Sequence, residues 1–275
     1  MKRVLITGAN SYIGTSVEKY LAQWPDQYQV DTIDMIDGSW REKSFAGYDS
    51  VFHVAGIAHI STRKLNHAAR EKYWTVNTIL PVEVARKAKE EYVKQFVFLS
   101  SMSVYGEHGS IENPVIITCD TLPKPKNIYG ESKLAAEEEL KKIQSPDFSV
   151  AILRPPMVYG PGCKGNYQTL IKGAQKLPFF PNIENQRSML HIENLCKFVK
   201  ELIDGEVAGM YFPQDERYIC TSEMVRKLAK EFGRNIILTK MFNPFLRLLS
   251  GRVALVDKVF GSLVYAEETR KQFIK

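Results

Sequence analysis

The alternation of short apolar runs with longer helical patterns constrains the fold of this chain more than any other feature. Helical patterns over about residues 12–24, 77–91 and 128–143 separate the runs. The runs, all rich in β-forming residues, are "RVLIT", "YQVDTID", "DSVFHVA", "QFVFLSS" and "FSVAILR". Nearly continuous apolar strands that alternate with helices are typical of a parallel sheet covered by helices on both faces. Because crossovers between parallel strands are right-handed, we expect an α/β fold with a doubly wound parallel sheet.

The pattern changes after Arg154, where the turn-rich stretch "PPMVYGPG" begins. Further helical patterns lie near residues 167–176, 193–204, 222–232 and 245–259, with the short strand "GMYF" among them. This interrupted pattern predicts a smaller second lobe. We therefore expect residues 1–160 to form the sheet domain and residues 161–275 the lobe, with about residues 190–213 returning to the sheet.

Composition narrows the classes of partner. The 37 Lys and Arg against 31 Asp and Glu give a net charge of +6, but both signs are mixed along the chain, so a nucleic-acid partner is not expected. No apolar run approaches the length of a membrane span and no signal sequence is present, which predicts a cytoplasmic protein. The cysteines lie far apart without a metal-ligand spacing, so neither a metal site nor a disulfide is expected: Cys119, Cys163, Cys196 and Cys220.

The first strand and helix are joined by "TGANSYIG", a turn with two glycines at the positions that a dinucleotide-binding turn requires. Gly8 would make the tight turn, and Gly14 would let the helix pack on the strand. Ser11 stands where a middle glycine is usual, but serine is small and is a preferred helix N-cap. We expect Ser11 at the helix start, with its amide or hydroxyl close to a pyrophosphate. A plain turn between strand and helix remains the alternative.

An acidic residue ends the second predicted strand. Asp34 lies 20 residues after Gly14, where a carboxylate can hold both ribose hydroxyls of an adenosine and repel a 2′-phosphate, which favours NAD over NADP. Asp31 and Asp37 compete for this role, and Asp37 could instead face the adenine.

The stretch "YGESK" places Tyr129 and Lys133 four residues apart, on one face of a predicted helix. The preceding strand ends in Ser100 and Ser101, and the carboxyl ends of the strands border the ligand crevice in this fold. For Tyr129 to act as a base near neutrality, its pKa must fall from ~10 to ~7, which needs about 4 kcal/mol. An exposed ion pair supplies less than about 1 kcal/mol. A partly buried Lys133 beside a cationic nicotinamide could supply it.

Five motifs in this order, "TGANSYIG", "HVAG", "LSSMSVYG", "YGESK" and "LRPPMVYGPG", together resemble the extended short-chain dehydrogenase/reductase family. The resemblance is to its NAD-dependent nucleotide-sugar epimerase/dehydratase group, which includes UDP-glucose 4-epimerases. It covers nearly the whole chain. It implies a Rossmann fold with a small C-terminal substrate-binding lobe, and NAD as the cofactor.

The resemblance also implies roles for individual residues. Tyr129 would be the acid/base at a sugar hydroxyl, Ser101 would hydrogen-bond the same hydroxyl, and Lys133 would hold the nicotinamide ribose and lower the pKa of Tyr129. Asn77 would support the active site. His53 and His59 are interpreted as packing residues. The residues implied to bind the cofactor are Gly8, Ser11, Tyr12, Ile13, Gly14, Asp34, Ala55, Gly56, Asn77, Tyr129 and Lys133.

On the substrate side, the resemblance puts Arg187 of "NQRSMLHIENL" on the diphosphate of the substrate, although an ordinary surface arginine is the alternative. Asn166 and Ser101 are further substrate-binding candidates. The sequence departs from the family's dehydratases, which carry an acidic pair where this chain has Met102 and Ser103. Dehydration is therefore not expected.

Three functions follow as expectations. The first is a UDP-sugar 4-epimerase, with UDP-glucose and UDP-galactose or their N-acetyl forms as substrates. The second is a reductase of a nucleotide 4-keto-sugar, which uses the same residues, and the third is a non-catalytic NAD(P)-sensing scaffold. Relatives often pair through two helices of each copy, here the helices of Asn77 and Tyr129, so a homodimer is also an expectation.

The stretch "MFNPFLRLLSGRVALVDKVFGSL" is amphipathic and carries basic residues. A core helix of the lobe is the expectation for it. The alternative is a helix that lies on a membrane surface or on a partner.

Overall fold

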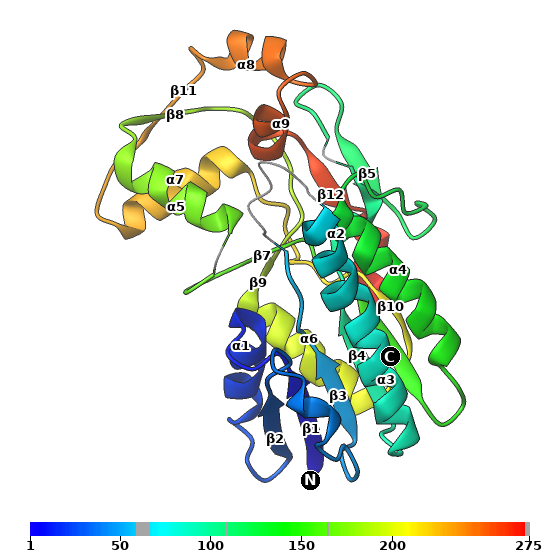
Figure 1. Cartoon of the computed structure of the whole chain (residues 1–275). Helices are drawn as coiled ribbons and strands as arrows, with labels where there is room; N and C mark the ends of the chain where they lie inside the picture. The colour runs from blue at the N-terminus through cyan, green and yellow to red at the C-terminus, as the bar shows by residue number, and fades with distance from the viewer. Residues whose placement is uncertain (59–66, 108, 164, 273–275) are drawn as a thin grey trace.

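The computed structural model describes residues 1–58, 67–107, 109–163 and 165–272. A sheet covered by helices forms one part of the molecule, and a smaller lobe lies beyond its end (Figure 1). The expected doubly wound parallel sheet is confirmed, with six strands that are all parallel to one another. Its strands are β1 (Lys2–Thr7), β2 (Tyr28–Ile33), β3 (Ser50–His53), β4 (Gln95–Leu99), β6 (Ser149–Leu153) and β10 (Gly209–Tyr211).

The strand order β10-β6-β4-β3-β1-β2 fixes where a ligand can bind. The chain passes from β1 outward to β2, then crosses back over β1 to β3 and continues in the other direction. Ligands of doubly wound sheets bind at such a switch point, outside the carboxyl ends of the strands. Thr7 and His53 are register partners at these ends of β1 and β3, so the site is expected just beyond them.

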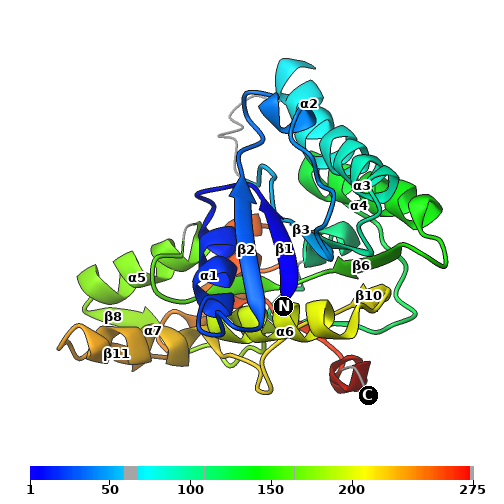
Figure 2. The same ribbon diagram turned by 90° about the horizontal axis from the view of Figure 1, so that it is seen from below.

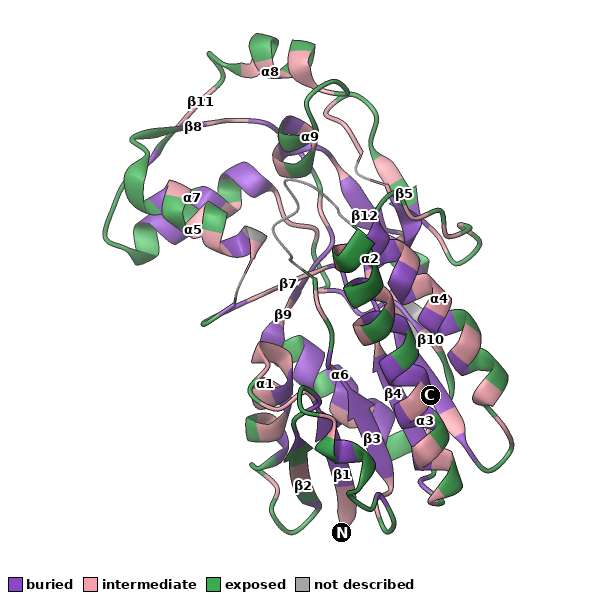
Figure 3. Ribbon diagram, viewed as in Figure 1, coloured by how far each residue is buried: buried purple, intermediate pink, exposed green. Residues whose placement is uncertain are grey.

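Helices cover both faces of the sheet, and Figure 2 shows the two layers from below. On one face, α1 (Tyr12–Leu21) and α6 (Ile192–Gly205) bury Val17 and Val199 against the strands. On the other face, α3 (Leu80–Glu90) and α4 (Ile128–Ile143) bury Val84 and Leu140. The core therefore lies in two apolar layers, which are purple in Figure 3.

The predicted helix over residues 77–91 is part of a longer composite in the structure. It consists of α2 (His67–Trp74), a π-helical turn (Thr75–Ile79) and α3. Pro81 has no N–H to donate to the carbonyl of Asn77, four residues earlier, so regular α-helical bonding is interrupted there. Similarly, α1 ends at Leu21 rather than near Trp24, and the residue before Pro25 is disfavoured in a helix.

The lobe is built on α5 (Asn166–Lys176) and α7 (Thr221–Glu231), which pack together. The predicted helix over residues 245–259 is wrong: two short helices, α8 (Asn243–Leu249) and α9 (Ala254–Phe260), occupy this stretch. Gly251 has φ +77° between them, a conformation that ends a helix.

Three parallel pairs complete the strands: β7 (Met157–Tyr159) with β9 (Met189–His191), β8 (Phe179–Pro181) with β11 (Ile237–Thr239), and β5 (Val115–Ile117) with β12 (Leu263–Tyr265). Short helical turns are η1 (Ser39–Arg41), η3 (Met102–Tyr105) and η4 (Glu267–Gln272).

Two later elements of the chain lie against the sheet: β10 pairs with β6, and α6 packs beside α1. The strand β12 also leaves the lobe, since Tyr265 is buried with Met102 and Tyr105. Of the helices in the described part of the chain, none combines the length and the apolar character needed to cross a membrane.

Candidate active site

The turn after β1 requires its first glycine. Gly8 has φ +96°, and a Cβ atom there would lie 2.8 Å from the backbone nitrogen of Ala55 at the end of β3. The amides of Gly8 and Ala9 both donate to the carbonyl of Ile33, at 2.9 and 3.1 Å. The loops after β1, β2 and β3 are thereby held together at the switch point of the sheet.

Ser11 is the N-cap of α1, as the sequence predicts. Its hydroxyl accepts the N–H of Gly14 at 3.1 Å, and its own amide donates to the carbonyl of Gly8 at 3.2 Å. Of the two groups of Ser11 that were expected near a phosphate, the amide already donates to Gly8. The hydroxyl accepts a hydrogen bond, so its proton is left to donate to a ligand. The N–H groups of Tyr12 and Ile13 belong to the first helical turn, which leaves its donors without helical partners.

A second contact point lies at Gly56, directly after β3. A Cβ atom at Gly56 would come within 3.2 Å of Oδ1 of Asn77 and 3.3 Å of Nζ of Lys133. Asn77, in the π-helical turn, accepts the N–H of Ile57 at 2.9 Å and donates to the Ile57 carbonyl at 3.0 Å and to Oγ of Ser132 at 3.1 Å. Asn77 thus joins the loop after β3 to α4.

Tyr129 lies in the first turn of α4, which Asn127 caps by accepting the N–H of Gly130. Burial raises the pKa of Tyr129, while a hydrogen bond with Ser101 acts in the opposite direction. Ser101 itself caps η3, and its Oγ lies 3.1 Å from Oγ of Ser103. The structure brings Ser101 and Tyr129 together, but in the protein alone nothing lowers the pKa of the phenol below its ordinary value.

Lys133 is buried one turn further along α4, with 4% of its surface exposed. Its Nζ donates to the carbonyl of Leu99 at 2.9 Å and lies 4.6 Å from the ring centre of Phe98. Burial lowers the pKa of Lys133 to about 8, although the carboxylate of Glu137 opposes this shift. The ammonium group is therefore held at the end of β4, where its charge is weakly solvated.

A buried network behind Lys133 was not predicted from the sequence. The carboxylate of Glu137 accepts hydrogen bonds from Ser100 and from the guanidinium of Arg154, whose Nε lies 3.1 Å from Oε1. Nη1 of Arg154 donates to the hydroxyl of Tyr105 at 2.7 Å. Two features of the sequence could have drawn attention to this network. Glu137 lies four residues after Lys133, and the charged Arg154 ends an apolar run.

His53 has the packing position that was expected. It is fully buried, its Nδ1 lies 2.8 Å from Oγ1 of Thr7, and burial together with the charge of Lys133 lowers its pKa to about 3. The imidazole is therefore neutral throughout the physiological range. His59 lies outside the described residues.

The three carboxylates near β2 differ in their surroundings. Asp31 accepts a hydrogen bond from the hydroxyl of Tyr48 at 2.8 Å. Asp34 is exposed directly after the strand and accepts the N–H of Ile36 at 2.8 Å, while Asp37 accepts from Ser39. Asp34, at the carboxyl end of the strand beside the Gly8 turn, stays the candidate for the ribose.

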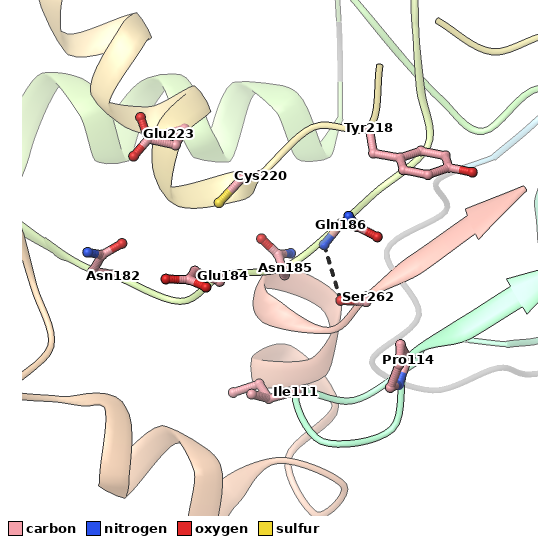
Figure 4. Close-up of a pocket in the computed structure, with 10 residues that line it drawn as sticks. All are labelled: Ile111, Pro114, Asn182, Glu184, Asn185, Gln186, Tyr218, Cys220, Glu223 and Ser262. Atoms are coloured by element: carbon pink, nitrogen blue, oxygen red, sulfur yellow. Dashed lines mark hydrogen bonds between the residues drawn. The ribbon is translucent and has the colours of Figure 1, made fainter. Parts of the chain in front are cut away.

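Of the substrate-side candidates, Ser101 belongs to this cluster, whereas Arg187 and Asn166 belong to segments outside the six-stranded sheet. Arg187 is half-buried before β9 and donates from Nη1 to the carbonyl of Gly261 at 2.9 Å, and burial lowers its pKa. A pocket of about 690 Å³ adjoins this segment and is lined by its neighbours Asn185, Gln186 and Ser262 (Figure 4). Asn166 begins α5, and its side chain lies outside the described part of the structure.

The described residues fit a bound dinucleotide. At Gly8 any larger residue would clash with Ala55, and the first turn of α1 leaves N–H groups without helical partners. Gly56, which has no side chain, faces the buried Lys133. Within the described residues, no group of three or more potential metal ligands occurs.

Comparison with known proteins agrees with this geometry. Residues 4–209 match the model of the NAD dependent epimerase/dehydratase family. UDP-glucose 4-epimerase from Vibrio cholerae is 30% identical over 290 residues, covering 95% of this chain and 86% of that protein. GDP-6-deoxy-D-mannose reductase from Pseudomonas aeruginosa is 25% identical, over 76% of this chain and 73% of that protein.

Among solved structures, MoeE5 in complex with UDP-glucose and NAD superposes with a TM-score of 0.72 at 18% identity, covering 98% of this chain and 92% of that one. At this identity the likeness supports the fold. The match of sequence, fold and motif geometry leads to one conclusion: the chain is an enzyme of the NAD dependent epimerase/dehydratase family, and its cofactor is NAD.

Proposed function

We propose that this enzyme is a UDP-sugar 4-epimerase. The observation that carries the proposal is the cluster in which Tyr129 is hydrogen-bonded to Ser101 and lies one helical turn from the buried Lys133. The similarity to the Vibrio cholerae epimerase, which spans 95% of this chain, supports it.

The residues of the cluster have distinct tasks. When bound, NAD supplies a nicotinamide that reversibly accepts hydride from carbon 4 of the sugar. Tyr129, as phenolate, takes the proton of the 4-hydroxyl and later returns it to the oxygen of the 4-keto sugar. Ser101 hydrogen-bonds the same oxygen, and Lys133 contributes positive charge that favours the phenolate. Gly8, Ser11, Tyr12, Ile13, Gly14 and Asp34 would hold the pyrophosphate and the adenosine ribose.

Epimerisation also requires that the sugar turn over without leaving the enzyme. A nucleoside diphosphate provides a fixed anchor of this kind. We infer that Arg187 holds the diphosphate, since a guanidinium carries five N–H donors and, among the described residues, its side chain makes a single hydrogen bond, from Nη1 to the Gly261 carbonyl.

A reductase of a nucleotide 4-keto-sugar is the second candidate, and the similarity to the Pseudomonas aeruginosa reductase favours it. Asp34 weighs against it where the reductant is NADPH, because an exposed carboxylate at the end of β2 repels a 2′-phosphate.

The two candidates differ in what happens to the sugar. The purified enzyme is incubated with UDP-glucose, UDP-galactose and their N-acetyl forms, with and without NAD, and the anomeric signals are followed by NMR. We expect interconversion without net consumption of cofactor. Inertness toward all four sugars, together with NAD(P)H oxidation on a nucleotide 4-keto-sugar, would assign the reductase instead.

The role of Tyr129 is tested by replacing Tyr129 with Phe. We expect turnover to fall by about a hundredfold to ten-thousandfold, the typical range for loss of a positioned acid/base, with cofactor binding retained. Tyr73→Phe is the matched control, since Tyr73 is a buried tyrosine close to Tyr129 and is expected to be dispensable for turnover. Unchanged turnover in Tyr129→Phe would refute the mechanism.

A further inference from the structure

The short helix α8 carries four large apolar side chains, of which two are partly buried and two are exposed. Leu246 and Leu249 pack against the apolar cluster of the lobe that contains Val256 and Phe260. Phe245 and Leu248, on the adjoining side of the helix, are each 61% exposed. A soluble helix normally presents polar residues on its outward face, so this outward face is unusual.

The exposed apolar residues continue on both sides of α8. Met241, just before the helix, is 73% exposed, and Leu255 in the first turn of α9 is 67% exposed. Half of the sixteen exposed large apolar side chains in the described chain fall within residues 232–255, so this segment is richer in them than the rest of the described chain. Figure 1 shows α8 at the outer end of the lobe, at the greatest distance from the sheet.

Basic residues accompany these apolar side chains. Residues 232–258 contain five basic residues and one acidic residue. The acidic one, Asp257, is engaged by the hydroxyl of Ser250 at 2.7 Å and the amide of Gly251 at 2.9 Å. The basic residues are Arg234, Lys240, Arg247, Arg252 and Lys258, of which Arg247 alone has an ion pair within the described structure, with Glu112.

We propose that the α8 surface, formed by Met241, Phe245, Leu248 and Leu255 with Lys240 and Arg252, docks the enzyme onto an anionic lipid membrane. The apolar side chains would enter the boundary between headgroups and acyl chains, and the basic side chains would lie among anionic headgroups. Because α8 has only seven residues, the contact is a shallow and reversible one.

The charge of the surface argues against a second copy of the chain as the occupant. A two-fold symmetric contact brings the same patch of both copies together. The basic residues of one copy would then face those of the other, and like charges across an interface are unfavourable. An anionic bilayer provides both an apolar acyl-chain region for the exposed apolar side chains and negatively charged headgroups for the basic ones.

Vesicle co-sedimentation of the full chain tests the proposal, without any substrate. We expect weak binding to phosphatidylcholine vesicles and at least tenfold tighter binding, roughly, to vesicles with about 30 mol % phosphatidylglycerol. The binding should weaken as salt rises, because exposed charges are screened. These measurements are independent of turnover, so their failure would leave the proposed epimerase activity untouched.

Two variants separate the apolar and basic contributions. F245S/L248S should abolish binding to anionic vesicles, and K240Q/R252Q should weaken it about fivefold or more per charge removed. Matched controls are Leu122→Ser, an 84% exposed leucine outside the lobe, and K141Q/K142Q on α4; both should bind as the unaltered chain does. All variants should keep their NAD affinity and thermal unfolding profile, which shows that they are folded.

Three results would overturn the proposal. The first is absence of binding to anionic vesicles at low salt. The second is equal loss of binding in Leu122→Ser and F245S/L248S, which would show that the binding is unspecific. The third is a concentration-dependent dimer in sedimentation velocity that F245S/L248S abolishes, which would assign the α8 surface to a second copy of the chain.

Discussion

At the scale of single residues, the charge of Lys133 depends on Glu137, four residues along α4. Burial alone pushes the pKa of Lys133 down, and the buried carboxylate partly restores it. Arg154 in turn neutralises Glu137 on its other side. We interpret Glu137 as a positioning residue, because it acts on the reaction through Lys133 and does not face a ligand.

Replacing Glu137 by Gln removes this support. The pKa of Lys133 should fall below its value of about 8, so the protonated form would be lost at lower pH. We expect the alkaline limb of kcat/KM to shift toward lower pH, as measured in pH profiles of sugar turnover. Because an unpaired buried charge costs about 3–5 kcal/mol, Arg154 will destabilise this variant, and assays belong well below its unfolding temperature.

Ser100→Ala serves as the control for that prediction. It removes one hydrogen bond from Glu137 and leaves every charge in place. Its pH profile should match that of the unaltered enzyme even if its stability is lower. An alkaline limb that does not move in Glu137→Gln would contradict the positioning role.

The residues that the sequence reveals are those with local signals. Gly8, Ser11, Tyr129 and Lys133 belong to short motifs whose spacing reflects one turn or one helix face. The Glu137 and Arg154 pair joins α4 to the residue that follows β6. The sequence marks each residue separately, but their pairing becomes visible only when the fold is known.

At the scale of elements, the π-helical turn between α2 and α3 places Asn77 between two segments of the site. Asn77→Ala would leave the amide and carbonyl of Ile57 and the hydroxyl of Ser132 without this partner. We expect a loss of about 1–3 kcal/mol in the free energy of unfolding and a several-fold weaker affinity for NAD. Denaturant unfolding and fluorescence titration with NAD would measure both.

Thr78→Val is the matched control for Asn77→Ala. Thr78 is the next residue of the π-helical turn and also bonds to α4, through the carbonyl of Ser132 at 2.7 Å. It has no contact with the loop after β3 in the hydrogen bonds described. Equal effects of both substitutions on NAD affinity would show that Asn77 contributes stability alone.

Element boundaries were predictable where capping and pattern agree. The bounds of α4 are those expected, and Asn127 supplies a side-chain cap at its start. The stretch over residues 245–259 also has a helical apolar pattern, yet Gly251 divides it into two helices. A glycine within an apolar pattern is tolerated in many helices, so its conformation here could not be read from the pattern.

At the scale of the whole molecule, the sheet and its switch point follow from the alternation of strands and helices. The position of β12, where the chain returns from the lobe, does not follow from this alternation. Tyr265 donates to the carbonyl of Arg154 at 2.7 Å, across 111 positions of sequence. The short strands of the lobe, of three residues each, carry too little periodicity to predict their partners.

The outer layer formed by α3 and α4 is where we expect two copies to pair. The helices lie side by side on one face of the sheet (Figure 2), and Ile79 at the end of the π-helical turn is 50% exposed. Sedimentation velocity should give twice the 31.4 kDa of the chain. Ile79→Lys should yield a monomer, whereas Ile36→Lys, at a 92% exposed position near β2, should not. A monomer at every concentration of the unaltered chain would exclude this pairing.

Tyr12 connects the two parts of the molecule. Its ring belongs to the apolar cluster beneath α1 and also to that of the lobe, and its hydroxyl lies beside Gly160, with burial raising its pKa to about 12. Any hinge motion that swings the lobe away from the sheet must therefore drag or release the first residue of α1. We therefore predict that, in the proposed epimerase, release of the sugar nucleotide and release of the cofactor are coupled through the side chain of Tyr12.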